Sequence, residues 1–131
     1  MPELQDILPE AFETRIQRAG IVNAWDDPKF KEAVIRHDRK NIIIAGVTTD
    51  VCLVYPAISA CQEGYNVQAV MDASGSPFDI SEEMSRRRME REGVVLTATN
   101  TLMAELAQDW SRPRGEQLLQ ILFQDVLPKI G

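Results

Sequence analysis

The chain has 131 residues, which is enough for one domain with a single hydrophobic core, and 44% of them are hydrophobic. Its formal net charge is -6, which argues against nucleic-acid binding because that function normally requires a basic patch. No apolar stretch approaches the roughly 20 residues of a membrane span. The first residues carry acids instead of the basic and then apolar regions of a secretory signal. We therefore expect one cytoplasmic domain, residues 1–131, that binds neither nucleic acid nor membranes.

The chain has two cysteines, Cys52 and Cys61, and one histidine. If both cysteines lie on one helix, nine residues apart, they are separated by roughly 13 Å along its axis, which is too far for a disulfide. A histidine-based metal site would need several such ligands at suitable spacing. The sequence therefore predicts reduced thiols, no bound metal and no cofactor.

The predicted elements begin weakly and then become regular. The first 25 residues offer at most one short strand, around residues 15–18. Asp26 or Asp27 can cap a helix whose first residue is Pro28. Residues 41–47 form a continuous apolar, β-branched run, which is typical of a strand buried on both faces of a parallel sheet.

Strands and helices alternate after this run. A helix is predicted from a cap at Thr49 or Asp50 to a stop at Gly64, followed by a strand over residues 65–73. Further helices are predicted over residues 81–93 and 100–110 and from residue 116 to near Pro128, with a buried strand over residues 94–99. Such alternation implies parallel strands joined by helical crossovers. We expect an α/β protein with a three-layer, Rossmann-like fold.

The sequence "GVTTDVC" places Cys52 one turn into a helix that follows a predicted strand. In open α/β sheets, ligands bind at the carboxyl ends of the strands. A helix N-terminus favours a thiolate, and its free amides can hold an oxyanion. Pro56 has no N–H for the Cys52 carbonyl, so the helix should be bent or loosened there. The alternative is that Cys52 is a small apolar core residue, and spacing alone does not choose between the two.

Residues 42–76, "IIIAGVTTDVCLVYPAISACQEGYNVQAVMDASGS", closely resemble the nucleophile segment of the isochorismatase-like cysteine hydrolases. That family includes nicotinamidases and N-carbamoylsarcosine amidohydrolases. The upstream "RAGIVNAWDDPKF" and the downstream "DW" with its C-terminal helix resemble an oligomeric subgroup of hydrolases whose substrate is unassigned. The resemblance extends from about residue 4 to residue 126 and implies an N-terminally truncated form of this fold.

The resemblance implies a hydrolase in which Cys52 attacks a carbonyl carbon, usually of an amide, in a small-molecule substrate. The peptide between Val47 and Thr48 would be cis, and the backbone amides of Thr48 and Cys52 would hold the oxyanion. The family's basic residue, commonly lysine, falls on Arg18, which keeps the charge but cannot readily exchange protons. Without the resemblance, Arg18 would be interpreted as an ordinary surface residue.

Three further residues are candidates for the walls of a substrate pocket. Asn23 and Trp25 follow Arg18 closely in the sequence, and Tyr55 lies one turn after Cys52. For Trp25, a position in the core or in an interface is the stronger interpretation. Asp50 is interpreted as a first-turn acid that complements the helix dipole, not as a catalytic base.

One element of the family pattern is missing. The third catalytic group of the family is an aspartate at the end of the first strand, and residue 1 of this chain matches the family after that strand. Loss of a general base costs roughly 10²–10⁴-fold in rate. The sequence therefore allows two hypotheses: an impaired amide hydrolase, or a catalytically inactive oligomeric binding or scaffold protein with the same fold. A thiol redox function is disfavoured because the chain has no CxxC motif.

Self-association follows from the same comparison. A sheet that lacks its first strands should expose an edge and apolar helix faces, which then need to be covered. The C-terminal helix is apolar on more than one face and is the expected interface element of a homo-oligomer. The side chains concerned are Leu118, Leu119, Ile121, Leu122, Phe123 and Val126.

Overall fold

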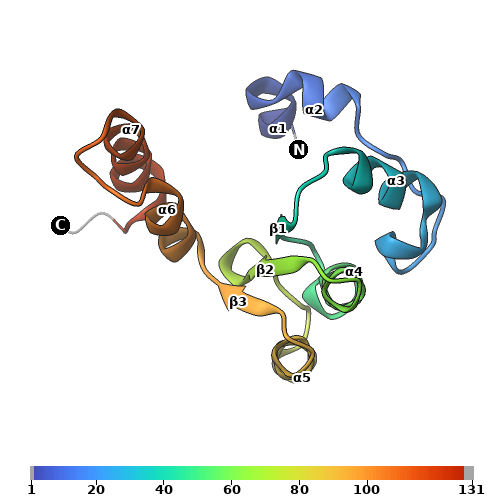
Figure 1. Cartoon of the computed structure of the whole chain (residues 1–131). Helices are drawn as coiled ribbons and strands as arrows, with labels where there is room; N and C mark the ends of the chain where they lie inside the picture. The colour runs from blue at the N-terminus through green and yellow to red at the C-terminus, as the bar shows by residue number, and fades with distance from the viewer. Residues whose placement is uncertain (1, 129–131) are drawn as a thin grey trace.

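The structure, a computed structural model, describes residues 2–128 (Figure 1). The helices are α1 (Pro2–Ile7), α2 (Pro9–Glu13), α3 (Pro28–Arg36), α4 (Val54–Gln62), α5 (Asp79–Arg91), α6 (Thr99–Ala107) and α7 (Pro113–Ile121). The strands are β1 (Asn41–Ile44), β2 (Asn66–Val70) and β3 (Val95–Thr97). Short helical turns are η1 (Ala24–Asp26), η2 (Thr49–Leu53), η3 (Met71–Ala73) and η4 (Leu122–Val126), of which η2 and η4 are π-helical.

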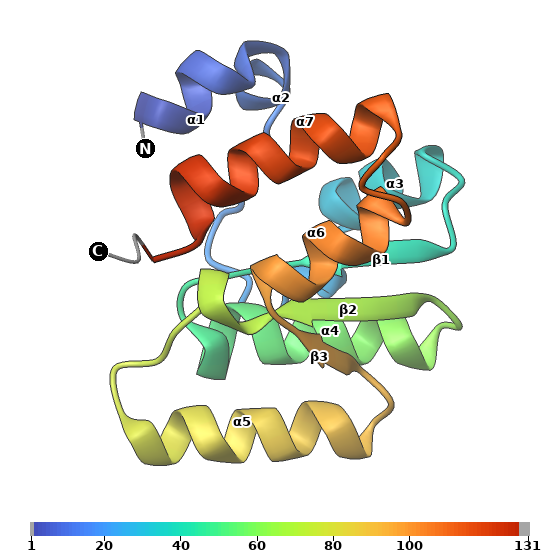
Figure 2. The same ribbon diagram turned by 90° about the vertical axis from the view of Figure 1, so that its left-hand side faces the viewer.

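The three strands form one parallel sheet in the order β1-β2-β3. Ile42 of β1 pairs with Val67 of β2, and Ala69 of β2 pairs with Leu96 of β3, so β2 is the central strand and β1 and β3 are the edges. Helices α4 and α5 lie on one side of the sheet, while α6 and α7 lie on the other (Figures 1 and 2). The predicted α/β fold with a parallel sheet is confirmed.

The hydrophobic core lies between the sheet and the helices α4 and α5. Val67 and Ala69 of β2 belong to one buried cluster with Leu53 of η2 and with Val54 and Ala57 of α4. Met89 of α5 and Val94, the residue before β3, belong to the same core, and so does Trp25 of η1. This core holds α4 and the preceding turn η2, which contains Cys52, against the sheet.

The prediction that the strands are buried on both faces is wrong. Ile43 is 49% exposed and Val95 is 57% exposed, although their neighbours in the strands face the core. Alternate side chains of a strand point to opposite faces. On the outer face, Gln68 donates a hydrogen bond to Glu105 of α6 at 2.9 Å, but the apolar side chains stay uncovered. A groove of about 530 Å³ runs there, lined by Ile43, Gln68, Val95, Leu102, Glu105 and Leu106, among others.

Two predicted helix boundaries are confirmed. The Asp27 carboxylate accepts hydrogen bonds from the N–H groups of Lys29 and Phe30, at 2.9 and 3.4 Å, and α3 begins at Pro28. Gly64, two residues after the end of α4, has a φ of 90°, a conformation that favours glycine.

The predicted strand over residues 15–18 is wrong. Helices α1 and α2 come before this segment, and residues 15–19 are irregular. A strand needs a partner backbone, and within residues 2–128 the strand β1 pairs only with β2. The other edge of β1 is therefore open, as the sequence predicted.

The C-terminal helix continues from α7 into η4 and keeps an apolar surface. Leu122 is buried, while Ile121 is 46% exposed and Phe123 is 64% exposed. Within the described part of the chain, no helix is long and apolar enough to cross a membrane.

Candidate active site

Cys52 lies in a π-helical turn between the end of β1 and the start of α4. The turn η2 covers Thr49–Leu53, directly before α4, and the Cys52 side chain is half-buried. Leu53, the next residue, is completely buried and anchors the turn in the core. The thiol therefore lies at the carboxyl end of a parallel strand, where ligands bind in open α/β sheets.

The hydrogen bonds of η2 explain its wide geometry. The N–H of Leu53 donates to the Thr48 carbonyl at 3.2 Å, and the N–H of Val54 donates to Thr49, each five residues back. Two residues after Val54, Pro56 has no N–H to offer the Cys52 carbonyl. The loosening that the sequence predicted near Pro56 is present as this π-helical turn, a feature frequently found at functional sites.

The peptide bond between Val47 and Thr48 is cis, as the family resemblance predicted. Among residues 2–128, no hydrogen bond engages the Thr48 N–H. The Cys52 N–H, in contrast, donates to the Thr48 carbonyl at 2.8 Å. Of the two amides predicted to hold an oxyanion, only that of Thr48 is unoccupied in the described part of the chain.

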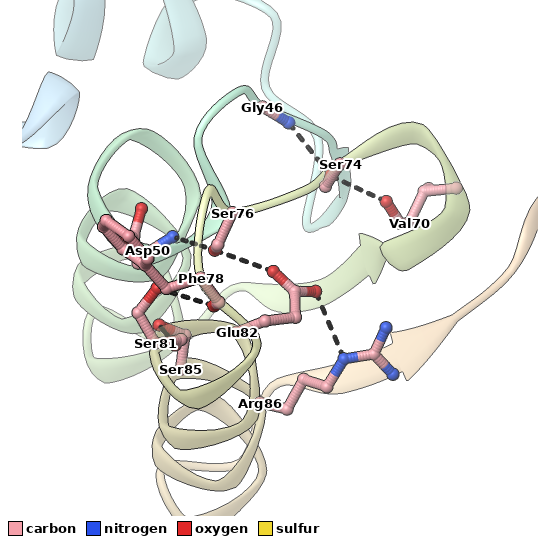
Figure 3. A network of polar contacts seen from close by, with 10 residues as sticks. All are labelled: Gly46, Asp50, Val70, Ser74, Ser76, Phe78, Ser81, Glu82, Ser85 and Arg86. Carbon is pink, nitrogen blue, oxygen red and sulfur yellow. Dashed lines mark hydrogen bonds and ion pairs between the residues drawn. The ribbon is translucent and has the colours of Figure 1, made fainter.

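A second loop lies beside this turn. Residues 74–76, which follow β2, form hydrogen bonds to Gly46 and Asp50 (Figure 3) and also to Thr49. The sequence included these residues in the family resemblance but assigned them no role. Their contacts join positions about 25 residues apart, so no local pattern could have revealed them.

Asp50 carries the acidic side chain closest to Cys52 in the sequence. The side chain of Thr48, and then that of Ser81, hold the pKa of the Asp50 carboxyl below its ordinary value. A general base works best when its pKa lies near the working pH. This agrees with the interpretation of Asp50 as a structural acid in the first turn.

The matching family model is the isochorismatase domain, which covers residues 3–101. This match includes β1, η2 with Cys52, α4, β2, α5 and β3, and therefore the whole site described above. The chain belongs to the isochorismatase family.

Two bacterial relatives within this family are particularly similar. "Probable hydrolase YcaC" of Escherichia coli is 39% identical over 128 residues, which are 98% of this chain and 60% of that protein. Its crystal structure, described as an octameric hydrolase of unknown specificity, has a TM-score of 0.86 and covers 94% of this chain and 58% of that one. YcaC from Pseudomonas aeruginosa, in a structure with hexane-2,5-diol and covalent acrylamide, is 37% identical with a TM-score of 0.83 and covers 91% of this chain and 59% of that one.

The chain thus spans about 60% of the length of these relatives. A protein described as MAR1 ribonuclease from Caenorhabditis elegans, 19% identical with a TM-score of 0.69, covers 79% of this chain and 53% of that one and shares the fold alone. Together these likenesses show an isochorismatase-type α/β fold, and Cys52 follows β1 within the matched residues.

Arg18, one of the predicted site residues, makes its contacts outside the π-helical turn. Its Nη1 donates to the Ile21 carbonyl at 2.8 Å, and its side chain lines a shallow surface hollow with Phe30 and Val34 of α3. Within residues 2–128, no hydrogen bond links Arg18 to Cys52. The role of Arg18 stays a prediction.

The three candidate pocket residues have structural contacts. Asn23 caps η1 through the Trp25 N–H at 3.0 Å and donates to Ser59 of α4 at 3.0 Å. Trp25 is buried in the core against the edge of Tyr65, which is the stronger of its two interpretations. Tyr55 is half-buried, with the Arg88 guanidinium 5.3 Å from its ring centre. A substrate contact for each of them stays a prediction, as does the absence of a metal or cofactor.

Proposed function

We propose that the chain acts as a cysteine hydrolase on an amide-type C–N bond of a small molecule, with Cys52 as the nucleophile. The observation that carries this proposal is the position of a half-buried thiol in a π-helical turn, four residues after a cis peptide whose amide is unoccupied. The family match and the description of the E. coli relative as a hydrolase support it. The proposed substrate remains a class, because the relative's specificity is itself described as unknown.

The proposed reaction has two stages. The Cys52 thiolate attacks the carbonyl carbon, and the C=O electron pair moves onto the oxygen, which the Thr48 N–H can hold. The tetrahedral intermediate then collapses, the C–N bond breaks, and the amine leaves with a proton from solvent or an acid. In the second stage, water attacks the thioester, releasing the carboxylic acid and the free thiol.

Acrylamide chemistry also supports a reactive thiol. Acrylamide is an electrophile that adds to thiolates, and the structure of the P. aeruginosa relative contains it in covalent form. Cys52 is the cysteine of this chain that lies in the π-helical turn after the cis peptide. We therefore propose Cys52 as the acrylamide-reactive residue here.

The test is competitive alkylation of the two cysteines in the native protein. Limiting acrylamide at neutral pH is expected to label Cys52 at least about tenfold faster than Cys61, because Cys52 occupies the proposed nucleophile position in the turn after the unoccupied Thr48 amide. Peptide mass spectrometry over time gives both rates. Cys61 is a matched control, since its thiol is also half-buried but donates to the Glu92 carbonyl at 3.3 Å. Equal labelling of both cysteines would contradict the proposal.

One observation favours an inactive binding protein as the second candidate. The carboxyls of Asp50, in η2, and Glu82, which is linked to η2 through Ser76, have lowered pKa values, so neither is tuned to take a proton from Cys52 at neutral pH. A panel of simple amides separates the two candidates. Fast Cys52 labelling without hydrolysis would favour the binding protein, whereas hydrolysis that is lost after alkylation would favour the enzyme.

We also propose that the chain self-associates through its C-terminal helix. The E. coli relative is described as octameric, and Phe123 of η4 exposes a large apolar side chain here. Light scattering at micromolar concentration is expected to give a mass that is a multiple of 14.7 kDa. Phe123→Asp should lower that mass because it places a charge in the apolar surface, while Gln124→Asp, at an exposed neighbouring position, should not. A monomeric wild-type protein would refute this proposal.

A further inference from the structure

The loop of residues 74–76 contacts the segment that leads to Cys52 at three successive points, of which Figure 3 shows the first and the last. The Gly46 N–H donates to Ser74 Oγ at 3.2 Å, the Thr49 N–H donates to the Gly75 carbonyl at 2.9 Å, and the Asp50 N–H donates to Ser76 Oγ at 3.2 Å. Val47 also forms a β-bridge with Gly75. The cis peptide and the first residues of η2 are thus held along their whole length by one neighbouring loop.

Ser76 is fixed in orientation because its hydroxyl has two different partners. It accepts from the Asp50 N–H and donates its own hydrogen to Glu82 Oε2 at 2.7 Å. A hydroxyl has one hydrogen to donate, so the bond to Glu82 leaves a lone pair to face Asp50. The Ser76 side chain therefore transmits the position of α5 to the backbone of the π-helical turn.

Glu82 is held in turn by α5 itself. Its Oε1 accepts from Arg86 Nε at 3.2 Å, one helical turn further on, and only 20% of its side chain is exposed. Burial alone would raise the pKa of the Glu82 carboxyl, but hydrogen bonds from Ser76 and Arg86 and the nearby Thr49 hydroxyl outweigh this and lower it. The carboxylate is consequently ionised at neutral pH and remains an acceptor for Ser76.

We infer that Ser76 and Glu82 are positioning residues for the nucleophile: the chain of contacts Arg86–Glu82–Ser76–Asp50 fixes the π-helical turn that carries Cys52. This inference rests on the proposed function. Cys52 follows Asp50 by two residues in the same turn, and the Asp50 N–H is one of the groups at the start of that turn. When it is fixed, the thiol and the Thr48 amide keep their relative position without reorganisation during attack.

Glu82 lies in the first turn of α5, where its charge complements the helix dipole, but it also has a more specific contact. Helix α5 begins at Asp79, so Glu82 lies at its fourth residue and reaches back to the loop before the helix. Its neighbour Glu83 pairs with Arg87 on the exposed side of α5 instead. The two adjacent glutamates therefore form a natural pair of test and control positions.

The test measures acrylamide labelling of Cys52 and Cys61 in single and double variants. Ser76→Ala and Glu82→Ala are each expected to slow Cys52 labelling about three- to tenfold, the effect of losing one net hydrogen bond. The double variant should be no slower than the more affected single variant, because both changes break one chain of contacts. Ser76→Thr, which keeps the hydroxyl, should restore the wild-type rate, and Glu83→Ala should leave it unchanged.

The labelling rate of Cys61 distinguishes a positioning role of Ser76 and Glu82 from a merely structural one. General loosening of the fold would expose Cys61 and raise its labelling rate, whereas loss of positioning should affect Cys52 alone. Equal effects at both cysteines, or additive effects of the two alanine changes, would overturn the inference. Wild-type protein in which Cys52 reacts no faster than Cys61 would refute the proposed function instead, while fast wild-type labelling that both alanine variants retain would refute only the positioning role.

Discussion

The Cys52→Ala variant is expected to lose amide hydrolysis by a factor on the order of 10³ or more while it keeps its fold. Removal of a nucleophile from a covalent mechanism eliminates the acyl-enzyme, so only binding and oxyanion contacts still assist the reaction. The side chain is half-buried and small, so its truncation leaves little empty volume. The measurement is hydrolysis of an amide that the wild-type protein turns over, followed under saturating conditions.

Two further variants identify the chemistry behind such a loss. Cys52→Ser keeps the size of the side chain but supplies a hydroxyl, which needs a base to act as a nucleophile, so it should be as inactive as Cys52→Ala. Cys61→Ala changes the cysteine at the far end of α4, whose contact is with the Glu92 carbonyl, and should retain wild-type activity. Activity that survives in Cys52→Ala would rule out the covalent mechanism.

Sequence patterns predicted the parts of the fold that depend on local chemistry. Asp27 with Pro28 marked the start of α3, Gly64 marked the end of α4, and the β-branched run before Gly46 marked β1. Helices α1 and α2 were missed because each has only five or six residues, too few for a helical period to be recognised. The incorrect strand over residues 15–18 shows that an apparent strand pattern means little without a partner backbone.

The sheet burial could not be predicted from the strand sequences for a related reason. A run such as that before Gly46 indicates apolar side chains on both faces, but it does not indicate whether a helix is present to cover each face. Helix α4 covers one face, and Ile43 on the other remains half exposed beside α6. The packing that decides this is a property of elements distant in sequence.

For the site, local physics and family resemblance contributed different parts. Local physics placed Cys52 at a helix start and associated Pro56 with a loosened turn, but the cis peptide at Val47 came only from the resemblance. The contacts of Ser76 and Glu82 came from neither source. Serine in a loop and glutamate at a helix start are both ordinary, and their roles become visible only when β1 and β2 place the two loops side by side.

Leu53→Ala is expected to destabilise the protein by about 2–5 kcal/mol, the usual cost of removing a large side chain from a packed core. Leu53 is completely buried, and it is the residue by which η2 is anchored between the sheet and α4. A Cβ added to Gly46 would contact the Leu53 Cβ at 3.5 Å, so the two segments that flank the cis peptide pack together here. The cavity left by alanine therefore opens next to Gly46, within the turn that carries Cys52, and labelling of Cys52 should slow along with the loss of stability.

The matched control is Val51→Ala, in the same π-helical turn but on its outer side, where the side chain is 39% exposed. Denaturant unfolding of both variants should show a loss of less than about 1 kcal/mol for Val51→Ala, since exposed positions contribute little. Similar losses in the two variants would mean that η2 is not anchored through Leu53. A large loss at Leu53 alone, accompanied by slower Cys52 labelling, would establish that the reactivity of the thiol depends on the core that holds its turn.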